Sequence, residues 1–144
     1  MLKRDLILRI IEELNRVVAR VEALRQQGAA AAAQAEVDST AAGVVGIDLS
    51  LAAGLGPTAL VPLVGEPVKL AALARLMLLR SELAGDRGDA PGATTWQSRA
   101  VELYLEAAAS GATLDEVARE VVEAWPEEAL SARGQALRRR LSAG

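Results

Sequence analysis

The sequence contains no cysteine, no histidine and no phenylalanine, and its only aromatic residues are Trp96, Tyr104 and Trp125. Without cysteine and histidine, the chain has no thiolate nucleophile, no imidazole base and no ligands for haem or for an ordinary zinc site. It also forms no disulfide, which agrees with a cytoplasmic location. These absences remove most enzyme chemistry, and we expect a protein that is not an enzyme, with no catalytic residue, no cofactor and no metal.

Basic charge is also scarce. The chain has 16 basic and 19 acidic residues, so its net charge is −3. Such a balance gives no general attraction to nucleic acid or to anionic lipid. Only Lys3 and Lys69 are lysines, and GC-rich codon usage explains the excess of arginine, and the missing phenylalanine, better than a functional use of arginine geometry. We therefore expect no nucleic-acid partner.

No long uninterrupted apolar run is present. Residues 49–65 carry no charge, but they are fewer than the ~20 residues that a spanning helix needs, and they include three glycines and two prolines. We therefore expect no membrane span here, but a buried connection or a short helix. Near the start, Arg9, Glu12 and Glu13 interrupt any apolar core of a signal peptide.

Alanine and leucine are abundant, with 30 and 22 residues in a chain of 144. Both residues rank at the top of the helix propensity scale, and this length suits one core. The composition predicts an all-α fold, a compact bundle of about six to seven helices that forms a single domain over 1–144.

Hydrophobic periodicity places the first helices. An apolar stripe with steps of three and four residues predicts a helix over 2–27, and Ile11 and Val18 widen the stripe beyond a coiled-coil seam. Gly28 suits a left-handed helix end. The alanine-rich segment 29–45 predicts a second helix that packs closely on the first, so that 2–45 forms an antiparallel hairpin.

The middle of the chain predicts an apolar connection over 47–67 and a helix over 68–84. Pro57 and Pro67 suit the first turns of helices. The helix over 68–84 is apolar nearly all round, which is typical of the most buried helix or of a helix that meets another subunit.

Turn and capping signals divide the remainder. Residues 85–92 read as a loop. Thr94 with Gln97, and Thr113 with Glu116, resemble capping boxes that open two further helices. Pro126 then ends one helix and can begin the last. These signals predict a hairpin over about 68–109 and C-terminal helices over about 113–141.

Two stretches carry a resemblance to known proteins. The N-terminal hairpin, with the segment GIDLSL after it, resembles the start of a small bacterial family of unknown function that is related to tetratricopeptide-repeat (TPR) proteins. The segment LARLMLLRSELAGDRGD to SRAVELYLEA is similar to one TPR helix pair, with Ala100, Tyr104 and Ala107 at the small–aromatic–small positions. No second copy recurs at the ~34-residue period. The resemblance implies TPR-like antiparallel hairpins and a bacterial origin, and it transfers no catalytic residue.

Five residues are candidates for contacts with a partner. Trp96 follows the 85–92 loop and is either a packing anchor or an exposed contact residue, since tryptophan is enriched at interface hot spots. A groove beside Trp96 and Tyr104, although Tyr104 also suits the core, is one candidate surface. The first helix, with Arg9, Arg16 and Arg20 on its polar face, is the other.

Three function hypotheses follow, in descending order. The first is a non-enzymatic interaction or scaffold module that binds another protein or itself, as a homodimer, because 49–65 and 68–84 are hard to bury in so small a domain. The second is a bundle that binds a small molecule or lipid in an apolar pocket near 49–65. The third is a carboxylate-dependent metal enzyme built on Glu116, Glu120 and Glu123, for which a solvated helix face is the simpler explanation.

Overall fold

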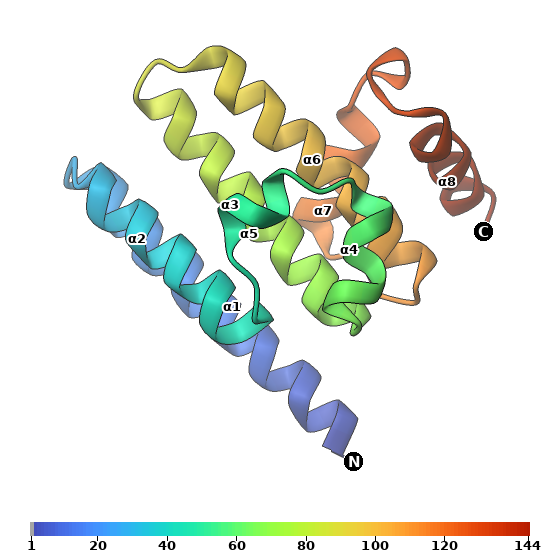
Figure 1. Ribbon diagram of the computed structural model, residues 1–144, viewed down its shortest axis with the longest axis horizontal. Coiled ribbons are helices and arrows are strands. Elements are labelled where there is room, and N and C mark those ends of the chain that lie inside the picture. Colours follow the sequence, from blue (N-terminus) through green and yellow to red (C-terminus); the bar gives the residue numbers. More distant parts are fainter. Residues whose placement is uncertain (1) are drawn as a thin grey trace.

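The computed structural model describes residues 2–144, and over this range the chain forms eight α-helices, two short helical turns and no strand (Figure 1). In chain order the elements are α1 (Leu2–Gln26), α2 (Ala30–Thr40), the π-helical turn η1 (Ala41–Val45), α3 (Leu49–Ala53), α4 (Pro57–Val64), α5 (Pro67–Asp86), α6 (Ala90–Ala109), α7 (Glu116–Ala124), the 3-10 turn η2 (Glu127–Ala129) and α8 (Ala132–Ala143). The prediction of a compact all-α fold is confirmed. The count exceeds the expected six to seven because the connection 47–67 contains two short helices.

Helix α5 is the centre of the molecule. Figure 1 shows it between the α1–α2 hairpin on one side and α6 on the other, with α3 and α4 in front. Twelve of its 20 residues are buried, among them Leu70, Leu73 and Leu76, which are fully buried. Of the two alternatives for a helix that is apolar nearly all round, the central, most buried helix is therefore the one that the structure shows.

The α1–α2 hairpin turns at Gly28, whose φ of 70° is left-handed, as the sequence predicts. Close packing rests on small side chains, because Ala33, Val37 and Ala41 are all fully buried. Contrary to expectation, α2 does not continue to residue 45. It becomes the π-helical turn η1, and the left-handed Gly46 (φ 86°) then redirects the chain.

The connection 47–67 covers the front of the core. Asp48 caps α3 by accepting a hydrogen bond from the Leu51 amide at 3.0 Å. Leu49, Ala52 and Leu60 are buried, and Pro57 begins α4 as predicted. No helix formed by residues 2–144 combines the length and apolarity needed to cross a bilayer.

The expected loop over 85–92 is wrong, because α5 continues to Asp86 and α6 already begins at Ala90. The Asp89 carboxylate accepts a hydrogen bond from the Gly92 amide at 2.9 Å and is the N-cap. It competes successfully with Thr94 because an aspartate N-cap followed by a proline in the first turn is a stronger start signal. Trp96 consequently lies in the second turn of α6 rather than in the first.

The C-terminal boundaries also differ from expectation. Asp115, not Thr113, caps α7 by accepting from the Ala118 amide at 2.9 Å. Pro126 begins the 3-10 turn η2, and the last helix starts only after Ser131, which accepts a hydrogen bond from the Gly134 amide. In both cases the helix begins after an aspartate or a serine, which are stronger N-caps than threonine.

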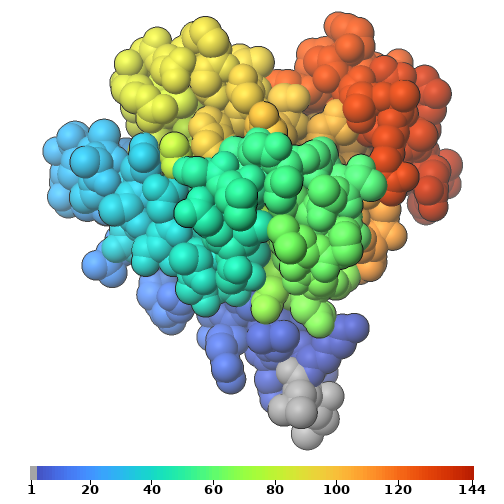
Figure 2. Space-filling view, viewed as in Figure 1, coloured from blue at the N-terminus to red at the C-terminus, as the bar shows by residue number. Residues whose placement is uncertain are grey.

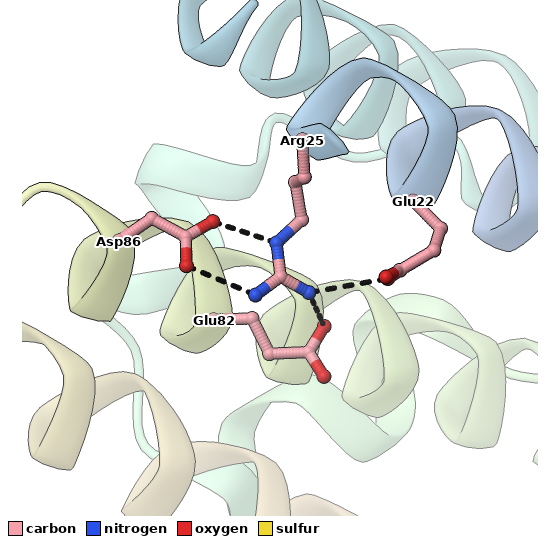
Figure 3. A network of polar contacts seen from close by, with 4 residues as sticks. All are labelled: Glu22, Arg25, Glu82 and Asp86. Atoms are coloured by element: carbon pink, nitrogen blue, oxygen red, sulfur yellow. Dashed lines mark hydrogen bonds and ion pairs between the residues drawn. The ribbon is translucent and has the colours of Figure 1, made fainter. Parts of the chain in front are cut away.

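An ionic cluster joins the C-terminal ends of α1 and α5, so the two helices run parallel. Figure 3 shows Arg25 of α1 surrounded by Glu22, Glu82 and Asp86. The Arg25 Nε donates to Asp86 at 2.6 Å, and its Nη1 lies 3.2 Å from Glu22 and 3.4 Å from Glu82. The hydrogen bond with Arg25 lowers the pKa of Asp86, whereas burial raises the pKa of Glu82. The cluster fastens the C-terminal end of α1 to the C-terminal end of α5. It makes no contact with the N-terminal ends of these two helices.

Candidate functional site

A groove of about 440 Å³ lies at the end of the molecule opposite to the Arg25 cluster. The N-terminal half of α1 forms one wall, the first half of α5 forms the floor, and the turn between α6 and α7 forms the other wall. Its apolar lining comprises Ile7, Ile10, Ile11, Leu14, Val68, Ala71, Ala72, Leu114 and Ala118, and its polar lining includes Lys3, Asn15, Glu66, Arg75, Tyr104 and Asp115. We call it the α1–α5 groove.

α2 covers only part of the length of α1. An ion pair between Arg20 and Glu36 (3.1 Å) fixes the register of the hairpin. Two antiparallel helices rise by the same distance per residue in opposite directions. The last residue of η1 is nine positions after Glu36, so it lies near the residue nine positions before Arg20, which is residue 11 of α1. The first turns of α1 extend beyond their partner, and Figure 2 shows them projecting from the body of the molecule. α5 is therefore the main neighbour of this end of α1.

This half of α1 exposes large apolar side chains. Ile10 is buried at 4% exposure, whereas Ile11 is 44% exposed and Leu8 is 49% exposed. Ile11 belongs to the lining of the α1–α5 groove, and Leu8 lies next to it on the outer edge of the helix. The wide apolar stripe that the sequence shows is thus only partly covered in the folded chain.

The floor of the groove holds two polar groups that belong to buried or half-buried residues. Tyr104 is only 2% exposed, and burial raises the pKa of its phenol well above the usual range, so its hydroxyl stays protonated. The charges of Arg75 and Asp115 act on the same hydroxyl in opposite directions. Arg75 is half-buried, and among residues 2–144 no carboxylate lies within 4 Å of its guanidinium.

The expected groove beside both Trp96 and Tyr104 is not formed. Tyr104 lines the α1–α5 groove. Trp96 lies two turns earlier on α6, half-buried against the core, with the Arg80 guanidinium 4.8 Å from its ring centre. Arg80 is itself buried and pairs with Asp38 of α2 at 2.8 Å. This stack makes Trp96 a packing anchor between α5 and α6.

The three candidate arginines of α1 lie on its exposed face and outside the groove lining. Arg16 pairs with Glu13 on the same helix. Arg20 pairs with Glu36 and so fastens α2 to α1. Arg9 is exposed farther toward the N-terminus, near the uncovered part of the helix.

Other expected sites are not where the sequence suggests them. The cavity beneath 49–65, lined by Leu55, Leu60, Met77 and Leu103 among others, has only about 10 Å³, because these side chains fill the space. A larger apolar hollow lies at α1 instead. Glu116, Glu120 and Glu123 are all exposed on α7, and residues 2–144 contain no group of three or more acidic side chains placed to hold a metal ion.

The sequence did carry one signal for the groove. Arg75 interrupts the apolar run from Leu70 to Leu79 in the most buried helix, and a charge at such a position is costly unless water or an opposite charge reaches it. The packing of α1 beside Arg75 creates the hollow, and no comparable pattern in the sequence predicts this packing.

Comparison of the chain with protein-family models, with curated proteins and with solved structures finds no match.

Proposed function

We propose that the chain is a non-enzymatic interaction module that pairs with a second copy of itself through the N-terminal half of α1. The observation that carries this proposal is the exposure of Leu8 and Ile11, at 49% and 44%, on the part of α1 that α2 leaves uncovered. Removing such side chains from water on association is favourable, and contiguous exposed apolar side chains mark interaction surfaces.

The charges around these residues favour a second copy as the partner. Arg4, Leu8 and Glu12 are spaced four residues apart and form one exposed row along α1. If two such rows pair in antiparallel fashion around a twofold axis at Leu8, Arg4 of each copy lies beside Glu12 of the other. The row is therefore complementary to itself, as an isologous interface requires. Leu51 and Leu63 are also exposed, but they lie on two different short helices.

Sedimentation equilibrium tests the apolar part of the proposal. We expect the wild-type chain to form a dimer and Leu8→Glu to raise its dissociation constant at least about tenfold, because the change removes Leu8 from both sides of the interface, a central interface residue contributes about 2 kcal/mol or more, and 1.4 kcal/mol corresponds to a factor of ten. The matched control is Leu51→Glu, which changes an equally apolar and even more exposed side chain on α3. A monomeric wild type, or a dimer that only Leu51→Glu weakens, overturns the proposal.

Charge reversal tests the geometry. Arg4→Glu and Glu12→Arg each place like charges at both symmetry-related contacts, so each variant should weaken the dimer. The double variant restores opposite charges and should recover most of the affinity. Surface ion pairs contribute about 0.2–1 kcal/mol, so the two contacts together should give a several-fold effect at low salt. Two single effects that simply add in the double variant contradict the antiparallel pairing.

We also propose that the chain is related to TPR proteins. In its support, α5 and α6 form an antiparallel hairpin, and Ala100, Tyr104 and Ala107 are all buried. Each helix has 20 residues, so the pair is longer than a 34-residue repeat. A bacterial origin follows from the same kinship, and the absence of cysteine supports a place in the reducing cytoplasm.

A further inference from the structure

We propose that the α1–α5 groove binds a small amphipathic carboxylate, that is, an aliphatic chain with one anionic head. This function goes beyond self-association, and of the side chains that carry the two proposals only Ile11 is shared. The groove volume of about 440 Å³ lies within the range of about 300–1,000 Å³ that is typical of ligand pockets. Ligand pockets are mostly apolar with a few convergent polar groups, and the groove has this composition.

The apolar part fits an aliphatic chain. Ile7, Ile10 and Leu14 line the groove from α1, and Ala71 and Ala72 line it from α5. Ala71 and Ala72 are small side chains in a helix whose most frequent buried residue is leucine, so they leave space at the floor. An aliphatic chain that fills the hollow gains the contacts and the burial that these small side chains leave available.

Arg75 supplies the position for the head. Arg75 is a half-buried residue that lines the groove, and its guanidinium has no carboxylate within 4 Å among residues 2–144. A guanidinium can hold a carboxylate with two parallel hydrogen bonds, and a partly desolvated cation gains more from such a partner than an exposed one does. The Tyr104 hydroxyl, kept protonated by burial, offers a further donor at the same end.

Two carboxylates lie near this position without pairing with Arg75: the charge of Asp115 acts on the Tyr104 hydroxyl, and the charge of Arg75 acts on Glu82. Asp115 already accepts a hydrogen bond from the Ala118 amide at the start of α7, where the helix dipole favours a negative charge. Lys3 and Glu66 both line the groove from the N-terminal ends of the parallel helices α1 and α5. Glu66 precedes Arg75 by nine residues, or about 13 Å along α5. The head is therefore expected at Arg75 and the chain along Ala71 and Ala72.

Isothermal titration calorimetry with decanoate and decanol, both below the concentration at which they aggregate, tests the proposal. We expect the wild-type chain to bind decanoate at least about tenfold more tightly than decanol, since charge-assisted hydrogen bonds contribute about 1.5–3 kcal/mol. Arg75→Gln should reduce the affinity for decanoate to that for decanol and leave decanol binding unchanged. Ala71→Leu, which fills the hollow, should weaken the binding of both.

The matched control is Arg99→Gln, because Arg99 is also half-buried and without a carboxylate within 4 Å, but lines the small cavity beneath 49–65. Its affinity for decanoate should equal that of the wild type. Circular dichroism of each variant verifies that the helices are retained. Equal affinity for acid and alcohol in the wild type, an equal loss in Arg99→Gln, or no binding of decanoate overturns the proposal. Leu8→Glu, which lies outside the groove lining, should leave decanoate binding intact, so that failure of the dimer is distinguishable.

Discussion

Replacement of Ala33 by leucine tests whether the alanine-rich helix α2 serves close packing. Ala33 has no exposed surface, and it shares the core with Val37 and Ala41, which are also fully buried. Leucine adds three carbon atoms where no space is available, so side chains or the helix axis must shift. Overpacking of this kind lowers the free energy of unfolding by about 1–3 kcal/mol, and the additional contacts of the leucine side chain do not offset this loss.

The matched control is Ala32→Leu, because residue 32 is exposed on the same helix and leucine has nearly the helix propensity of alanine. Urea unfolding monitored by circular dichroism should show Ala33→Leu less stable by about 2 kcal/mol and Ala32→Leu within about 0.5 kcal/mol of the wild type. For a chain of this size, 2 kcal/mol corresponds to a fall in Tm of roughly 6–8 °C. Equal stability of the two variants refutes close packing between α1 and α2.

Two further changes address the ionic contacts. Asp38→Ala leaves the buried Arg80 without its carboxylate and should lower the urea midpoint by the equivalent of about 1–2 kcal/mol, which is less than for a fully buried pair because Asp38 is partly exposed. Arg80→Met removes the buried charge as well, so its loss of stability should be smaller. A larger loss in Arg80→Met than in Asp38→Ala contradicts this reasoning. Arg25 lowers the pKa of Asp86 in the folded chain. The stability that the Arg25–Asp86 contact contributes is therefore present above the unfolded-state pKa of Asp86, about 4, and is lost as the pH falls through its folded-state pKa. Asp86→Asn should therefore lose less stability than the wild type between pH 6 and pH 3, and parallel curves would show that the contact has no net effect.

Helix identities were predictable from the sequence, but several helix ends were not. The stripes of α1 and α5 extend over many turns, so the periodicity of buried positions outweighs any local ambiguity. At the ends, two capping signals compete within a few residues. Asp89 begins α6 in preference to Thr94, and Asp115 begins α7 in preference to Thr113, because an aspartate carboxylate is the stronger acceptor for the free amides.

The candidate site depends on contacts between residues far apart in the chain, which explains why the sequence placed it poorly. From the sequence, Trp96 is either a packing anchor or an exposed contact residue, and the choice depends on Arg80 of the preceding helix, which lies over its ring. Tyr104 reads as a core residue, and it is one, but one that also lines the groove. In both cases the decisive neighbour belongs to another helix, and no local pattern encodes it.

The uncovered end of α1 has a single structural cause, the early end of α2. At Thr40 the α-helical hydrogen bonding gives way to the π-helical turn, and Gly46, in the left-handed region, directs the chain across the front of α5. Had α2 continued as far as α1 does, it would lie along the side of α1 that carries Arg20, and this end of α1 would have a second helical neighbour. The apolar surface that the composition suggests for 49–65 is exposed there in part, because Leu51 and Leu63 are 60% and 59% exposed, and α1 adds Leu8 and Ile11 to it. The free length of α1 at the proposed pairing surface therefore follows from one turn in the chain, whereas the α1–α5 groove lies on the side of α1 that faces α5.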